Sequence, residues 1–125
     1  MATLTEPQTR RAYEDAVTLA ITEVVKRLQD ALGTKLVAYL ASVSDPKAVG
    51  DWARGTRPPR RGAEERLRTA LHAYRLLEEA DSVHVARAWF IGLNPQLDDE
   101  APASALREGR QKDVLIAARS FAQTG

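Results

Sequence analysis

The chain has 125 residues, of which 44% are hydrophobic and 28% are charged, so its composition is that of a globular protein rather than a disordered one. It contains no cysteine, which excludes disulfides and zinc sites with thiolate ligands. The net charge of +1 is unevenly spread: residues 1–62 hold ten Lys/Arg against seven Asp/Glu, and the remainder holds eight against ten. A basic region within a nearly neutral chain indicates local contact with a polyanion.

We expect a cytoplasmic protein without membrane contact. No apolar run approaches the roughly 20 residues that cross a bilayer. The N-terminal residues also lack the basic start and apolar core of a signal peptide.

The first predicted element is one long helix from Arg10 to Leu32, ended by Gly33. Apolar residues recur in it at intervals of three and four, and Tyr13 and Val17 belong to the resulting stripe. This length exceeds the average of about 11–12 residues. The stripe therefore either covers the core of its own domain or packs partly against a second chain.

Two short helices are predicted next, one over residues 35–41 and one from Pro46 to Arg54. Asp45 suits the N-cap of the second helix, Pro46 its first position and Gly55 the residue just past its last turn. Helical spacing then separates a buried face, Ala48, Val49 and Trp52, from an exposed one, Lys47, Gly50, Asp51 and Arg54.

Two short helices followed by a longer one match the helix-turn-helix, in which the second helix enters the major groove of DNA. The candidate DNA-binding residues are Lys47, Gly50, Asp51, Arg54, Arg57, Arg60 and Arg61. Asp51 is unfavourable, because a carboxylate repels phosphate unless Arg54 or a cytosine amino group engages it. A second interpretation therefore stays open, in which the two helices have lost DNA binding and serve only as a scaffold.

The remaining pattern is also helical. Long helices are predicted from Gly62 to about residue 80 and from Val83 to about Ile91, then a turn over residues 92–95 and an acidic loop. Two short helices follow, over residues 102–106 and 111–121. No stretch alternates apolar and polar residues as a strand does, so the fold class is predicted to be all-α.

Nothing in the sequence indicates an enzyme. His72 and His84 fall on different predicted helices with no cysteine or spaced carboxylates to complete a metal site, and they are expected to be ordinary surface or half-buried histidines. A phosphate-binding glycine loop and a nucleophile elbow are both missing. We expect no catalytic residue, no metal and no cofactor.

Several sequence blocks together resemble the Xre/MbcA/ParS-type antitoxin family. In the first half they are DPKAVGDWARG at 45–55, RPPR at 57–60 and ERLR at 65–68. In the second half they are WFIGLNPQL at 89–97, APA at 101–103, LREG at 106–109 and VLIAA at 114–118. The second half is more specific, because a helix-turn-helix occurs in many regulators. The long first helix carries no matching motif.

The resemblance implies a type II antitoxin with an N-terminal helix (residues 1–33), an Xre-like helix-turn-helix domain (34–80) and a toxin-binding domain (81–125). Such a protein neutralises a partner toxin, usually a RES-domain enzyme that destroys NAD, and represses its own operon. Carried over to matching positions, the residues that shape the binding domain are Trp89, Asn94, Pro95, Leu97, Pro102, Leu106 and Arg107.

Just past the last matched block, Arg119 and Phe121 are predicted to approach the toxin most closely, since an arginine beside an aromatic is a common interface pairing. The alternative for Phe121 is that it only anchors the last helix.

Two functions from different classes remain open. The first is a toxin-neutralising protein whose C-terminal half is an inhibitory interface. The second is a free-standing DNA-binding repressor whose C-terminal half only dimerises it. In either case we expect a homodimer, or a larger complex with the toxin.

Overall fold

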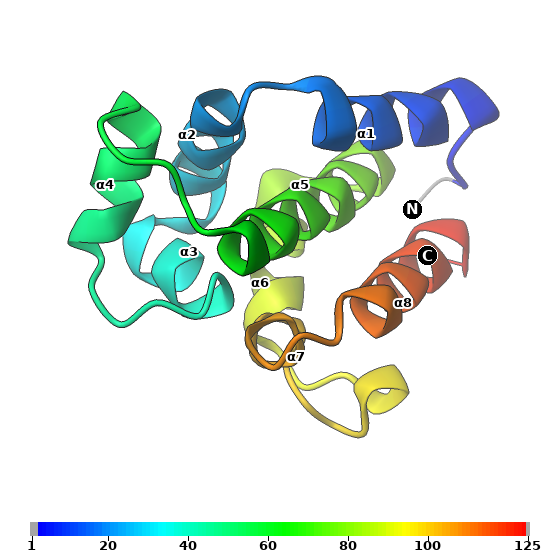
Figure 1. Ribbon diagram of the computed structural model, residues 1–125. Coiled ribbons are helices and arrows are strands. Elements are labelled where there is room, and N and C mark those ends of the chain that lie inside the picture. The colour runs from blue at the N-terminus through cyan, green and yellow to red at the C-terminus, as the bar shows by residue number, and fades with distance from the viewer. Residues whose placement is uncertain (1–2, 125) are drawn as a thin grey trace.

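A computed structural model describes residues 3–124, and it confirms the all-α expectation: this part of the chain forms helices joined by short loops and no β-strand (Figure 1). The elements in order are α1 (Glu6–Thr18), α2 (Ile21–Leu32), α3 (Thr34–Leu40), α4 (Lys47–Arg54), α5 (Arg61–Ala80), α6 (Val83–Ile91), a 3-10 turn η1 (Pro95–Leu97), α7 (Pro102–Arg107) and α8 (Gln111–Thr124). Over these residues, none of the helices combines the length and apolarity that a membrane span needs.

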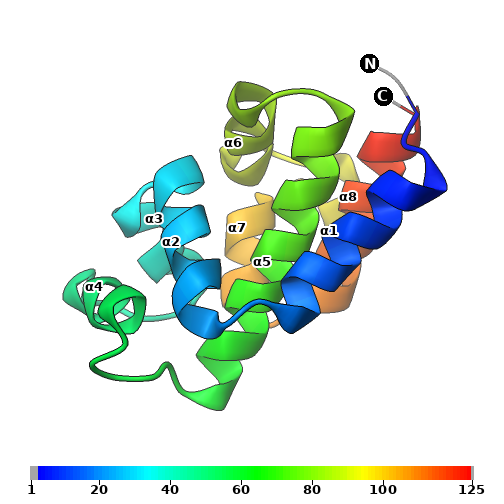
Figure 2. The ribbon, with the colours of Figure 1, turned by 90° about the horizontal axis from the view of Figure 1, so that it is seen from above.

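The 20-residue helix α5 lies in the middle of the molecule (Figure 2). In that view α1 and α8 lie on one side of it and α2, α3 and α4 on the other. Its buried side chains point in more than one direction: Ala63, Leu67, Ala70, Leu71, His72, Ala73, Tyr74, Leu76, Leu77 and Ala80. A helix that is apolar on most of its circumference is stable in water only when other elements enclose it.

The prediction of one long N-terminal helix is wrong. The chain breaks between α1 and α2 at Leu19 and Ala20, whose ψ angles of 144° and 145° are extended. Neither residue is glycine or proline, so no local signal marks the break. Its cause is tertiary: the Arg68 guanidinium on α5 donates hydrogen bonds to the carbonyls of Ala16 (3.0 Å) and Leu19 (2.9 Å) at the end of α1.

The break also changes which face of α1 is buried. Ala12 and Ala16 face the core, whereas Tyr13 and Val17 are 53% and 49% exposed. Two alanines allow α1 to lie close against α5, which bulkier residues on that face would prevent. The predicted continuous stripe therefore holds for α2 but is rotated in α1.

The C-terminal elements agree closely with expectation. Helix α6 spans Val83–Ile91 as predicted, and the Ser82 hydroxyl caps it by accepting the Val85 N–H at 3.2 Å. Side chains from all three predicted domains join one hydrophobic core, among them Leu28, Leu67 and Phe90. The helices after α5 are therefore packed on the same core as those before it.

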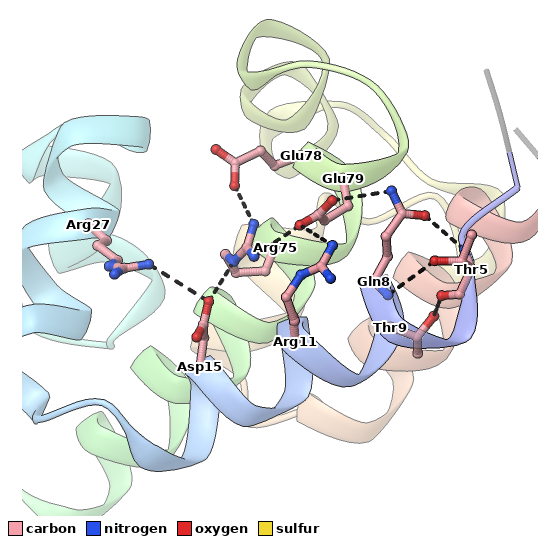
Figure 3. A network of polar contacts seen from close by, with 9 residues as sticks. All are labelled: Thr5, Gln8, Thr9, Arg11, Asp15, Arg27, Arg75, Glu78 and Glu79. Atoms are coloured by element: carbon pink, nitrogen blue, oxygen red, sulfur yellow. Dashed lines mark hydrogen bonds and ion pairs between the residues drawn. The ribbon is translucent and has the colours of Figure 1, made fainter.

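A charged network fixes α1 to α5 (Figure 3). The Arg75 guanidinium, only 14% exposed, donates to Asp15 on α1 (2.9 Å) and to Glu78 (2.6 Å) and Glu79 (3.1 Å) on its own helix. Burial alone would lower the pKa of Arg75, but the hydrogen bonds to these carboxylates raise it above the usual value. The network therefore places a permanently charged arginine between two helices.

Replacing Arg75 with alanine is expected to lower the free energy of unfolding by about 2 kcal/mol, because three partly buried carboxylates lose their shared guanidinium. Of the remaining ion pairs in the network, those of Asp15 with Arg27 and of Glu79 with Arg11 are longer, at 3.8 Å each. Urea denaturation measures the loss of stability.

Arg10→Ala is the matched control. Arg10 is 58% exposed and, among residues 3–124, pairs only with Glu6 one turn away, so its loss should cost less than about 0.5 kcal/mol. Equal losses in the two variants would contradict the role of the network.

Candidate nucleic-acid and protein interfaces

Helices α3 and α4 lie where the sequence predicts two short helices joined by a turn. The turn passes through Ser42 in the left-handed region (φ 66°). Helix α4 begins at Lys47 with Pro46 as its N-cap, one residue later than predicted, and the Asp45 carboxylate accepts the Lys47 N–H at 2.9 Å. At the other end Gly55 has φ 77°, which a residue with a Cβ adopts only with strain.

The exposed face of α4 carries the predicted residues. Ala48, Val49 and Trp52 are buried, whereas Lys47 is exposed and the Arg54 side chain is 65% exposed. Asp51 is paired with Arg54, one of the two partners that would offset its repulsion of phosphate. It accepts a hydrogen bond from Arg54 at 2.7 Å and forms an ion pair with Arg57 at 3.6 Å. The carboxylate thus neutralises part of the positive charge that this face would offer to phosphate.

Gly50 has a packing role on the same face. A Cβ at this position would lie 3.1 Å from the Arg54 Nη1 atom, so the glycine gives the arginine room to fold back to Asp51. The close approach at Gly50 is therefore made by a side chain of the same helix.

The two arginines before and at the start of α5 differ in their surroundings. The Arg61 side chain is 94% exposed and pairs with Glu65 one turn along the helix. Arg60 is also exposed but lines a cleft together with Arg57. Lys47, Arg54, Arg57, Arg60 and Arg61 all lie on α4, on the following loop or at the first residue of α5.

Most of the residues implied for toxin binding are structural in this chain. Leu97 and Leu106 are fully buried, and Pro102 is buried with them. The Asn94 side chain accepts the Gln96 N–H at 2.9 Å and so begins the turn η1. Of these four residues only Asn94 is partly exposed, so the other three support the surrounding surface without forming part of it.

Arg107 joins α7 to α3. Its Nη1 donates to the Tyr39 carbonyl at 2.8 Å, and its guanidinium lies 4.8 Å from the centre of the Tyr39 ring. Trp89 is half-buried with its ring edge-on to Phe90, whereas Pro95 is exposed. On α8, Arg119 is exposed and Phe121 is half-buried against the core.

Two exposed apolar residues were missed by sequence reasoning. Ile91 is 61% exposed and Leu93 is 78% exposed, the largest values among the bulky apolar side chains of residues 3–124. Both lie inside WFIGLNPQL. A signal was available: with Ala86 and Phe90 facing the core, helical spacing turns Ile91 outward.

His72 differs from the expectation of an ordinary surface or half-buried histidine. It is 6% exposed, and the Tyr13 ring packs edge-on against it at a centroid distance of 5.6 Å. Burial, together with the smaller effect of the nearby positive charge of Arg119, lowers the pKa of His72 to about 4. His72 is therefore a neutral core residue at pH 7, whereas His84 is exposed. Within the described part of the chain, no three His, Asp or Glu side chains are grouped to hold a metal ion.

Comparisons with protein families, with curated proteins and with solved structures find no match to this chain.

The free energy of unfolding should fall as the pH drops from 6.5 towards 4. In this range the unfolded chain binds a proton at residue 72 but the folded protein does not, which removes up to about 3 kcal/mol. Above pH 7 the imidazole is neutral in both states and contributes no pH dependence. Chemical denaturation of His72→Gln across this range should show a smaller slope than the natural chain, whereas His84→Gln should keep the full slope. The same slope in all three proteins would contradict the assignment.

Proposed function

We propose that this protein is the antitoxin of a type II toxin–antitoxin system. It binds and neutralises a RES-domain, NAD-degrading toxin through its C-terminal helices, and it represses its own operon by placing α4 on DNA. The observation that carries the proposal is the exposure of Ile91 and Leu93 within WFIGLNPQL, the block with the most specific resemblance to the antitoxin family.

A protein partner explains this exposure. Each side chain would contribute about 1.5–3 kcal/mol if a partner buried it fully. Pro95 is exposed two residues further on and Trp89 is half-buried two residues before, so the apolar surface extends along the segment. Apolar side chains that gather at one place on a surface are typical of an interaction site.

Helix α8 contributes to the same half of the molecule, with Arg119 as its exposed cation near the chain end. Removing residues 110–125 is a poor test of this contribution. Val114, Ala117, Ala118 and Ala122 are buried against the core, so truncation would uncover apolar residues of α5 as well as remove an interface. Single exposed substitutions avoid this ambiguity.

Ile91→Asp should abolish or strongly reduce neutralisation when the antitoxin is co-expressed with a toxic neighbouring RES-domain protein. A carboxylate in a desolvated apolar contact has no partner and is costly to bury. Growth rescue and co-purification both measure the effect. Arg119→Ala tests the predicted approach of the tail in the same assay.

Val17→Asp is the matched control, since Val17 is similarly exposed (49%) but lies on α1, outside the resembling blocks. It should neutralise the toxin as well as the natural chain does. If Ile91→Asp neutralises fully, the assignment of this surface is wrong.

For DNA binding, the support is the exposed face of α4 with Lys47 and Arg54, and Asp51 provides the sharpest test. Lys47→Ala and Arg54→Ala should weaken binding to the operator and leave the toxin complex intact. Asp51→Asn should strengthen binding to duplex DNA of any sequence, because it removes a repulsive charge and releases Arg54 and Arg57 for phosphate.

Gel shifts at two salt concentrations measure these changes. Lys112→Ala on α8 removes an exposed positive charge far from α4 in the sequence and should leave DNA affinity unchanged. Unchanged affinity in the Lys47, Arg54 and Asp51 variants would favour the interpretation of α3 and α4 as a scaffold without DNA binding.

A free-standing repressor is the second candidate, and one observation favours it. Ile116 on α8 is 54% exposed, which gives the C-terminal half an apolar residue available for dimerisation. The two candidates differ in what a tagged copy retains during purification: a toxin protein in the first case, and only a second copy of the chain in the second.

A further inference from the structure

An open cleft of about 840 Å³ lies beside the helix–turn–helix. Its walls come from the turn after α3, from α4 and the loop that follows it, and from the first turns of α5. Ligand sites for small molecules typically measure roughly 300–1,000 Å³. The cleft is therefore large enough for a small organic molecule.

The charges on its walls select an anion. Arg57, Arg60 and Arg66 line the cleft against one carboxylate, that of Asp45, which already accepts the Lys47 N–H. Arg66 is held in place because it donates to the carbonyls of Leu106 (2.9 Å) and Gly62 (3.1 Å). No hydrogen bond or ion pair to another described residue is assigned to Arg60, so its guanidinium is available to a ligand.

The backbone adds to this preference. Helix α5 begins without a side-chain cap, and Gly62 and Ala63 of its first turn line the cleft. The first amide hydrogens of a helix carry partial positive charge and favour anions. This contribution supports the three arginines and would not define a site without them.

The other walls are apolar or weakly polar. Val43, Ala48, Pro58 and Trp52 line the cleft together with the hydroxyl-bearing Ser42. An inorganic anion would leave these surfaces uncovered. A molecule that joins a phosphate to a less polar body would cover both kinds of wall.

We propose that this cleft binds a small organic phosphate of nucleotide size, with the phosphate group between Arg57, Arg60 and the start of α5. Because Arg57 and Arg60 are also candidate DNA contacts, an occupied cleft would weaken the hold of this region on DNA. Binding of the small molecule itself requires neither DNA binding nor a toxin partner, so it can be tested separately from both.

Adenosine 5′-monophosphate is a suitable probe, and the two tryptophans of the full chain provide the readout. Trp52 lines the cleft, whereas Trp89 lies on α6. In ¹H–¹⁵N NMR spectra, the probe should move the Trp52 indole signal to saturation and leave that of Trp89 in place. Adenosine and inorganic phosphate, which each supply only half of the ligand, should bind more weakly than the nucleotide.

Arg60→Ala should weaken the nucleotide by about tenfold, the effect of one hydrogen bond to a charged group. Arg61→Ala is the matched control: it removes the same charge from the adjacent residue, which points away into solvent, and should change the affinity by less than about twofold. Arg57→Ala is a second variant on the cleft wall and should also weaken the nucleotide.

The proposal is overturned if the nucleotide gives no saturable shift at millimolar concentration. It is overturned as well if Arg60→Ala and the control Arg61→Ala weaken the nucleotide equally, which would indicate general attraction of anions. It is also overturned if inorganic phosphate binds as tightly as the nucleotide. If only duplex DNA moves the Trp52 signal, the cleft is a contact for the DNA backbone. None of these results bears on toxin neutralisation.

Discussion

The fold depends on the enclosure of α5. Because its buried residues lie on more than one side, α5 has no stable position in water until α1, α2, α6 and α8 pack around it. Helix α5 packs against α2 and α3 as well as against α6, α7 and α8, so it supports both halves of the molecule. Residues 3–124 consequently share one hydrophobic core, and a change at Leu67 or Leu77 is expected to affect both proposed interfaces.

Three arginines of α5 extend this constraint to neighbouring segments. Arg66 donates to the Leu106 carbonyl at the end of α7, Arg68 donates to two carbonyls at the end of α1, and Arg75 donates to Asp15 in the last turn of α1. Each guanidinium reaches a carbonyl or carboxylate of a neighbouring segment and adds a charge-assisted hydrogen bond to it. The apolar side chains of α5 thus pack the core, and its arginines position α1 and α7 relative to it.

The sequence was most informative where a local signal and the tertiary structure agree. Ser82 and the glycine after Ile91 correctly marked the two ends of α6. Asp45 and Gly55 marked the ends of α4 to within one residue. The break at residues 19–20 was not predictable, because no glycine or proline marks it and Arg68 lies 49 residues further along the chain. The exposure of individual side chains was also predicted incompletely. Helical periodicity gave the buried and exposed faces of α4, but it placed Tyr13 on a buried face and did not identify Ile91 as exposed.

The candidate sites show the same division. Residue types and spacing led to Lys47 and Arg54, but nothing in the sequence decided whether Arg54 would reach DNA or fold back onto Asp51. The conformation of Arg54 depends on the space beside Gly50, where a Cβ would lie 3.1 Å from the Arg54 Nη1 atom. Leu97 and Leu106 belong to the sequence blocks that resemble the antitoxin family, yet both are core residues in this structure. A matching block does not by itself distinguish a contact residue from a core residue.

The loop after Leu93 has a kinetic consequence. Asn94 accepts the Asp99 N–H and donates to the Glu100 carbonyl, and Asp98 and Asp99 both occupy the left-handed region to close the loop. Leu93 is therefore displayed on a backbone that is already ordered before any encounter. A partner that covers it would lose little conformational entropy on docking, so the gain in affinity would appear as a long residence time of the complex rather than as faster association.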